Sequence, residues 1–172
     1  MRILVIDDQP GNQESARATL AEHDLTVVGT VEEAFALFKD NNDTQFDVVL
    51  TDLWMPTPQN LRAECGESFL GVKISDSTDA AQIDAGVFFV LAAVVRGVKY
   101  VGIVTDSSHH SDRRVVLLDL IDSKTGMFSS AVVLQKGLPV TIRKFEKRNY
   151  RTPNHAKNWG KVLRCLLEDA KH

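Results

Sequence analysis

Carboxylates follow two short apolar segments in the first third of the chain. Asp7 and Asp8 come directly after Arg2 to Ile6 (RILVI), and Asp52 ends the segment FDVVLTD. Carboxylates that lie close together raise one another's pKa and repel one another, so a cation between them would resolve the conflict. Oxygen ligands suit Mg²⁺, which leaves coordination positions open for a phosphate. An aspartate beside such an ion can act as a nucleophile toward phosphorus.

The segments that would position these carboxylates alternate between strand and helix patterns. RILVI, LTVVGT and FDVVLTD are typical of short buried strands. Between them, QESARATLAEH and VEEAFALFKDN space their apolar residues like one face of a helix, and Asn12 is a candidate N-cap for the first of these. Strand–helix units in this order imply parallel strands joined by right-handed crossovers.

The rest of the chain continues the alternation. AGVFFVLAAVVRG is apolar nearly all round, which predicts a well-covered helix packed on the sheet. YVGIVTD and AVVLQ are expected as strands four and five, SDRRVVLLDLID as the helix between them, and NHAKNWGKVLRCLLEDAK as the closing helix.

Together these units predict an α/β fold with a doubly wound five-stranded parallel sheet and helices on both faces. The expected strand order is 2-1-3-4-5, the flavodoxin-like arrangement. Ligands bind such sheets beyond the carboxyl ends of the strands, where the strand order reverses. Asp7, Asp8 and Asp52 would therefore converge in one pocket if strands one and three are neighbours.

Length and composition fit a single domain over residues 1–172. Apolar residues make up 44% and charged residues 25% of the chain, as is ordinary for a globular protein. The net charge of -3 argues against a protein built mainly to coat nucleic acid. The longest apolar stretch, from Val87 to Val95, is too short to span a bilayer, so no membrane association is expected and the cytoplasm is the expected location.

The segments RILVIDDQP, VVLTDLWMP and VGIVTD, in this order, resemble the receiver domain of two-component response regulators. In that family an aspartate after strand three accepts a phosphoryl group, and the resemblance assigns this role to Asp52. It implies Mg²⁺ bound by Asp7, Asp8 and Asp52, with Asp8 and Asp52 as direct ligands, and by the backbone carbonyl of Trp54. It also implies that Thr105 contacts the phosphoryl oxygen and helps to switch the domain.

Receiver domains also carry a lysine after strand five that pairs with the acceptor and its phosphate. Lys136, at the end of AVVLQK, is the expected counterpart. Lys144 in VTIRKF is the alternative, because strand five could be the second of these two runs. The segment AVVLQ lacks the aromatic switch residue that the family has in this strand.

Two segments are longer than a plain receiver needs. The first, at about 57–82, follows strand three and would lie beside the pocket, as a small hairpin, a lid, a docking surface or a surface decoration. The second, at about 123–154, extends the region of strand five and the last helix. Basic residues between Lys136 and Arg151 could bind nucleic acid, but such a stretch is more often a solvated face, and nucleic acid is not the expected partner.

These observations predict a stand-alone receiver, phosphorylated by a sensor histidine kinase or a phosphotransfer protein, that signals to a downstream protein. A homodimer is a candidate assembly. The receiver would be no enzyme beyond Mg²⁺-dependent phosphoryl acceptance and self-dephosphorylation. The alternative is a pseudo-receiver, an interaction module that works without phosphorylation. An aspartyl-phosphate phosphohydrolase ranks last, because it would need an aspartate where Trp54 stands.

Overall fold

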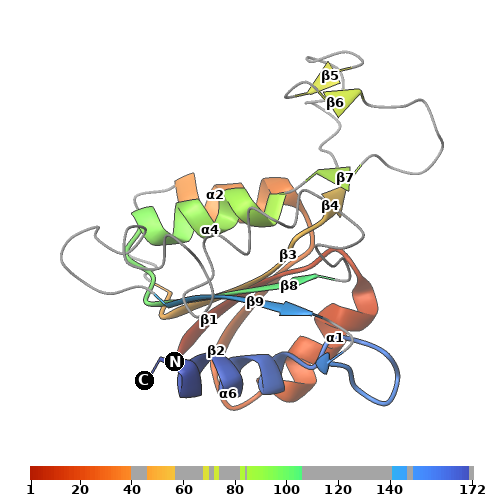
Figure 1. Cartoon of the computed structure of the whole chain (residues 1–172), viewed down its shortest axis with the longest axis vertical. Helices are drawn as coiled ribbons and strands as arrows, with labels where there is room; N and C mark the ends of the chain where they lie inside the picture. The colour runs from red at the N-terminus through yellow and green to blue at the C-terminus, as the bar shows by residue number, and fades with distance from the viewer. Residues whose placement is uncertain are drawn as a thin grey trace.

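Five parallel strands form the central sheet of the computed structural model, which describes residues 1–39, 46–56, 68–69, 72–73, 82–83, 85–105, 141–146 and 149–170. The strands are β1 (Arg2–Ile6), β2 (Asp24–Val28), β3 (Val48–Asp52), β8 (Tyr100–Thr105) and β9 (Thr141–Glu146). Their order across the sheet is β2-β1-β3-β8-β9, and all five are labelled in Figure 1. Counted along the chain, this is the predicted order 2-1-3-4-5, and the predicted doubly wound fold is confirmed.

Helices cover both faces of the sheet (Figure 1). On one face lie α2 (Val31–Lys39) and α4 (Ala85–Val95), and on the other lie α1 (Pro10–Thr19) and α6 (Trp159–Asp169). Successive strand residues point to opposite faces. Leu4 therefore packs in the core beneath α2 and α4, whereas Ile3 packs in the core beneath α1 and α6. Within the described ranges, no helix is both long and apolar enough to cross a bilayer.

Two short antiparallel pairs lie in or next to the predicted insertion at 57–82. One joins β4 (Met55–Pro56) to β7 (Gln82–Ile83), and the other joins β5 (Ser68–Phe69) to β6 (Val72–Lys73). The second pair matches the small hairpin that the sequence suggested. The other residues of the insertion lie outside the described residues.

The first helix starts earlier than predicted, which corrects the role of Asn12. Pro10 occupies the first turn of α1, where its fixed φ and missing N–H fit, and Gln9 stands at the N-cap position. Asn12 is therefore inside the helix, and its side chain is buried rather than capping.

The closing helix starts later than predicted. Its N-cap is Asn158, whose Oδ1 accepts a hydrogen bond from the backbone N–H of Lys161 at 3.0 Å, and Trp159 is the first helical residue. Residues 154–158 are thus part of a loop. Gly160 allows a close approach of α6 to α1, because a Cβ there would come within 2.7 Å of the Thr19 carbonyl oxygen.

The fifth strand is the second of the two candidate runs, β9, while AVVLQ lies outside the described residues. An aromatic residue is therefore present in this strand after all: Phe145 is buried, pairs with Val104 of β8 and packs edge-on against Tyr150. The helix predicted at SDRRVVLLDLID also lies outside the described residues.

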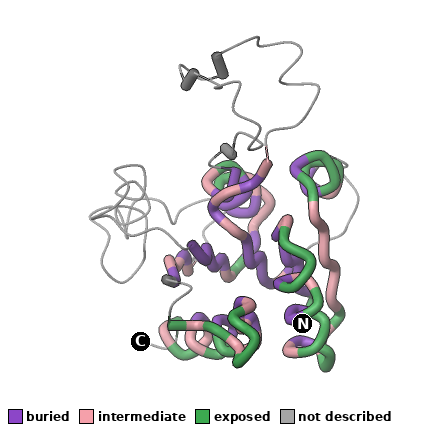
Figure 2. The backbone as a smooth tube through the Cα atoms, turned by 90° about the vertical axis from the view of Figure 1, so that its right-hand side faces the viewer, coloured by how far each residue is buried: buried purple, intermediate pink, exposed green. Residues whose placement is uncertain are grey.

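Helix α4 is less covered than its apolar sequence predicted. Its sheet-facing side, including Phe89 and Val90, is fully buried, but Phe88, Leu91 and Val95 are exposed. The helix lies in an outer layer, so only one side of it contacts the sheet. Figure 2 shows that the helical segments carry both buried and exposed residues.

Candidate functional site

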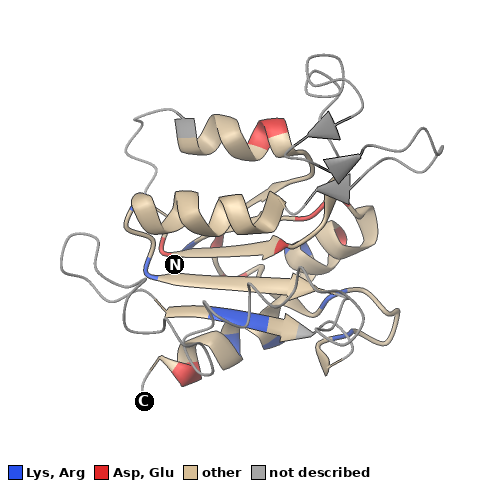
Figure 3. Cartoon of the chain, turned by 45° about the horizontal axis from the view of Figure 1, so that its top comes forward, with Lys and Arg blue, Asp and Glu red and all other residues tan. Residues whose placement is uncertain are grey.

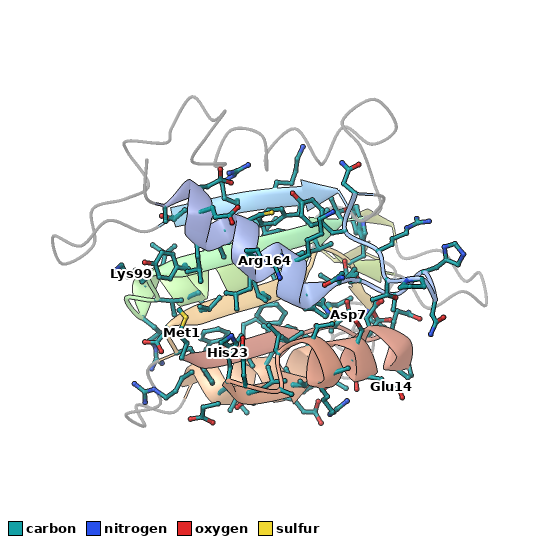
Figure 4. All side chains as sticks on the ribbon, turned by 90° about the horizontal axis from the view of Figure 1, so that it is seen from below. Met1, Asp7, Glu14, His23, Lys99 and Arg164 are labelled. Carbon is teal, nitrogen blue, oxygen red and sulfur yellow. The ribbon has the colours of Figure 1, made fainter. Side chains whose placement is uncertain are left out.

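The three predicted carboxylates converge at one edge of the sheet. β1 and β3 are parallel neighbours with Ile6 opposite Thr51, so Asp7, Asp8 and Asp52 follow two adjacent strand ends. One carboxylate oxygen from each lies within 4.8 Å of the others. Figure 4 places Asp7 at this edge, beside the loop that leads into α6.

A lysine that sequence reasoning missed lies between these carboxylates. The Nζ atom of Lys157 is 2.6 Å from Oδ2 of Asp7 and 2.6 Å from Oδ2 of Asp52. Only 1% of the Lys157 side chain is exposed, compared with 13% for Asp52 and none for Asp7. An ammonium group buried in this way needs its charge balanced, and the two carboxylates balance it.

The loop before α6 brings Lys157 to this place. The chain turns back on itself between Arg151 and Lys157, which form an isolated antiparallel bridge. Within the turn, the N–H of Thr152 donates to the Ala156 carbonyl at 2.8 Å, and His155 adopts a left-handed conformation with φ of 62°. Figure 3 shows basic segments of this loop and acidic strand ends at the same edge of the sheet.

The other lysine candidates are placed differently. Lys136 lies outside the described residues, and Lys144 stands inside β9, opposite Ile103 of β8. The sequence pattern placed Lys157 inside the closing helix, so it was not recognised as a site residue. The signals that could have found it are the turn-forming residues of TPNHAKN and the good N-cap residue Asn158 directly after it.

Protein donors surround the carboxylate of Asp7. Its Oδ1 accepts from the backbone N–H of Gln9 at 2.9 Å and from Nδ2 of Asn12 at 3.0 Å, and its Oδ2 accepts from the same Nδ2 at 3.1 Å and from Lys157. Asp8 is more accessible, and its Oδ2 accepts from Nε2 of Gln9 at 2.8 Å. Asp7 is thus held by the protein, whereas Asp8 and Asp52 keep more capacity for a further cation.

The charges of the cluster shift its pKa values. Burial raises the pKa of Asp52 to about 6, although the Lys157 ammonium opposes the rise. Burial and the charge of Asp7 likewise raise the pKa of Asp8. For Lys157, burial alone would lower the pKa, but the charges of Asp52 and Asp7 outweigh it and raise the pKa above its usual value.

The donor set fits a divalent cation. When all four groups are ionised, three carboxylates face one ammonium, which leaves two negative charges in excess. A hard divalent ion such as Mg²⁺, with its preference for oxygen ligands, would compensate this excess. Asp8 and Asp52 are the residues that would hold it.

Other predicted site residues border the cluster. Thr105 is fully buried at the end of β8, next to β3, and directly follows Val104, the partner of Asp52. The backbone N–H of Trp54 points to Oδ1 of Asp52 at 3.4 Å. The start of α4 presses against the same turn, because a Cβ on Gly86 would come within 2.3 Å of the Asp52 carbonyl oxygen.

These features define a doubly wound α/β fold with an acidic cluster at the carboxyl ends of two neighbouring strands. Residues 3–61 match the family model of the response regulator receiver domain. The whole fold resembles the crystal structure of a response regulator receiver domain protein from Clostridium thermocellum, with a TM-score of 0.50 and 15% sequence identity, over 98% of this chain and 95% of that one. Among curated proteins, none matches the sequence.

These comparisons confirm the resemblance that the motifs predicted. The family model covers the segment with Asp7, Asp8 and Asp52, and the structural match supports the same fold for the described residues beyond it.

Proposed function

We propose that the protein is a stand-alone response regulator receiver, phosphorylated on Asp52 by a histidine kinase or a phosphotransfer protein in the cytoplasm. The observation that carries this proposal is the position of Asp52, at the end of β3, beside two further carboxylates and in contact with a buried ammonium group. Nucleophile, metal ligands and a positive charge for the phosphoryl oxygens are thus within one pocket.

Asp52 has to be ionised to attack phosphorus. With a pKa of about 6, it is mostly a carboxylate at neutral pH and above. An O–P bond forms to Asp52 as the P–N bond of the phosphohistidine donor breaks. Mg²⁺, when bound by Asp8, Asp52 and the Trp54 carbonyl, would neutralise charge on the transferred group.

Lys157 takes the role that the sequence assigned to Lys136 or Lys144. Its ammonium already contacts Asp52, so it would contact an oxygen of a phosphoryl group placed there. The hydroxyl of Thr105 is the proposed second contact and links the pocket to β8. A changed position of either group would alter the surface that a downstream protein recognises.

The chain is proposed to turn over no substrate other than its own phosphoryl group. A phosphohydrolase that works through an aspartyl phosphate would need an acid–base aspartate at the position of Trp54, so this activity is not proposed. The alternative is a pseudo-receiver, and one observation favours it: Lys157 already compensates part of the acidic charge without a metal ion.

Phosphorylation can be tested with small donors. The protein is incubated with Mg²⁺ and acetyl phosphate or phosphoramidate, and its intact mass is measured at once. We expect a gain of one phosphoryl group that needs Mg²⁺ and is absent from Asp52→Asn. A gain that persists in Asp52→Asn would move the acceptor to another residue. No gain in the wild type would favour the pseudo-receiver.

A further inference from the structure

The side chain of Asn12 joins two parts of the pocket that come from opposite ends of the sequence. Its Nδ2 donates to both carboxylate oxygens of Asp7, at 3.0 and 3.1 Å. Its Oδ1 accepts a hydrogen bond from the backbone N–H of Lys157 at 2.9 Å. One carboxamide thus contacts the acid on one side and the lysine's own backbone on the other.

Asn12 lies in the first turn of α1, and only 4% of the residue is exposed. Burial of a carboxamide is costly unless its donor and acceptor groups are satisfied. Here both ends are satisfied, and every partner belongs to the pocket or to the loop that completes it.

Lys157 depends on such contacts because it stands in a loop and not in the central sheet. Its backbone N–H bonds to Asn12, and its backbone carbonyl accepts from Oγ of Ser15 at 2.7 Å. Two residues later, Trp159 donates its indole N–H to the backbone carbonyl of Asn12 at 3.0 Å. Helix α1 therefore holds the loop at several points. Of these contacts, only the one made by the Asn12 carboxamide also involves Asp7.

We propose that Asn12 is a positioning residue of the phosphoacceptor pocket: its carboxamide ties the Asp7 carboxylate to the backbone of Lys157 and so holds the ammonium between Asp7 and Asp52. This inference rests on the proposed receiver function and adds a residue to it. Asn12 itself does not touch Asp52 in any described contact, so it acts through Lys157 and Asp7.

The test compares Asn12→Ala with Ser15→Ala. Both substitutions remove a hydrogen bond to the backbone of Lys157, but only the first removes a contact with Asp7. Because bonds to charged groups are the stronger ones, we expect phosphorylation by acetyl phosphate to slow roughly tenfold or more in Asn12→Ala and by less than about threefold in Ser15→Ala. Asn12→Asp keeps an acceptor for Lys157 but sets a carboxylate against Asp7, so it should behave like Asn12→Ala.

A second measurement does not depend on phosphorylation. The ammonium protons of a buried, ion-paired lysine exchange slowly with water, so Lys157 should give its own resonance in a lysine-selective ¹H–¹⁵N spectrum. We expect this resonance in the wild type and in Ser15→Ala, and its loss in Asn12→Ala. The backbone amide spectrum reports whether each variant is folded.

The outcomes separate this inference from the proposed function. An unphosphorylated wild type would remove the receiver function, while the ammonium resonance would still decide the role of Asn12. An unchanged rate together with a retained resonance in folded Asn12→Ala would overturn the inference. If Asn12→Ala does not fold, Asn12→Ser replaces it, because its hydroxyl is too short to span Asp7 and Lys157, and the same losses are expected.

Discussion

The ammonium nitrogen of Lys157 lies 2.6 Å from Oδ2 of Asp52, although the two residues come from distant parts of the sequence. The same nitrogen is equally close to Asp7, so one positive charge is shared by two carboxylates from different strands. Lys157 thus connects the loop before α6 to the ends of β1 and β3. Among the described ion pairs, no other residue does so. The predictions below follow from it and from the packing around Asp52.

Removal of the ammonium should destabilise the fold. Lys157→Met keeps the length of the side chain but leaves Asp7 and Asp52 without their shared partner, which should cost about 3 kcal/mol of unfolding free energy. Urea denaturation at neutral pH measures this loss. Lys161→Met is the matched control, because Lys161 is exposed on α6 and its ammonium donates only to the Asn149 carbonyl in the described hydrogen bonds. Equal stability of the two variants would contradict the assigned ion pairs.

The contribution of Asp52 to stability should fall as the pH rises from about 4 to about 6. The folded-state pKa of Asp52 is raised from 3.8 to about 6, so in this window the folded protein binds more protons than the unfolded chain. Ionisation of Asp52 therefore costs stability, on the order of 2 kcal/mol by pH 7 relative to pH 4. The difference in unfolding free energy between wild type and Asp52→Asn, followed over this pH range, isolates the contribution. A difference that is constant with pH would refute it.

Mg²⁺ should stabilise the folded protein at neutral pH. The ion would bind the excess negative charge of the pocket, and a ligand that binds only the folded state raises the unfolding free energy by about 1.4 kcal/mol for each tenfold excess over Kd. Thermal unfolding with and without Mg²⁺ measures the effect. Asp8→Asn should abolish it without loss of the fold, since the Asp8 side chain bonds only to Gln9 among its described hydrogen bonds. Glu14→Gln, on the exposed side of α1, should leave it unchanged. A full Mg²⁺ effect in Asp8→Asn would exclude Asp8 as a ligand.

Gly86→Ala should disturb the acceptor. The added methyl group would meet the Asp52 carbonyl oxygen at 2.3 Å and the Leu53 Cα at 2.8 Å, both backbone atoms that cannot turn away. We expect a loss of about 2 kcal/mol in unfolding free energy and slower phosphorylation of Asp52. Gly11→Ala is the control, because nothing lies within 4 Å of its added methyl group, and it should be neutral or slightly stabilising. Equal behaviour of both variants would argue against the close contact of α4 with β3.

The parts that were predictable from sequence are those with local or periodic signals. Buried runs that end in aspartates indicated β1 and β3, and the strand-order rule for doubly wound sheets was sufficient to bring Asp7, Asp8 and Asp52 to one edge. The choice of VTIRKF as a possible fifth strand was open in the sequence and is β9 in the structure. Periodicity could not decide it, because both runs are short and each has the β-branched residues of a strand.

Lys157 and Asn12 were missed because their roles depend on contacts between distant residues. Lys157 falls within a segment that was predicted as helix. Only the N-cap at Asn158 shows that α6 begins after it. Asn12 was predicted as an N-cap, which is the common local use of asparagine, while its observed partners are Asp7 and Lys157. No local rule indicates that a helical asparagine bonds to a loop near the other end of the sequence.

The order of the pocket residues along the chain also matters during synthesis. Asp7 and Asp52 leave the ribosome before Lys157 and the helix that follows it. A nascent chain can therefore assemble β1 and β3 with their acidic ends still uncompensated by the protein's own ammonium. Until Lys157 emerges, any cation in the surrounding solution is a candidate to take its place.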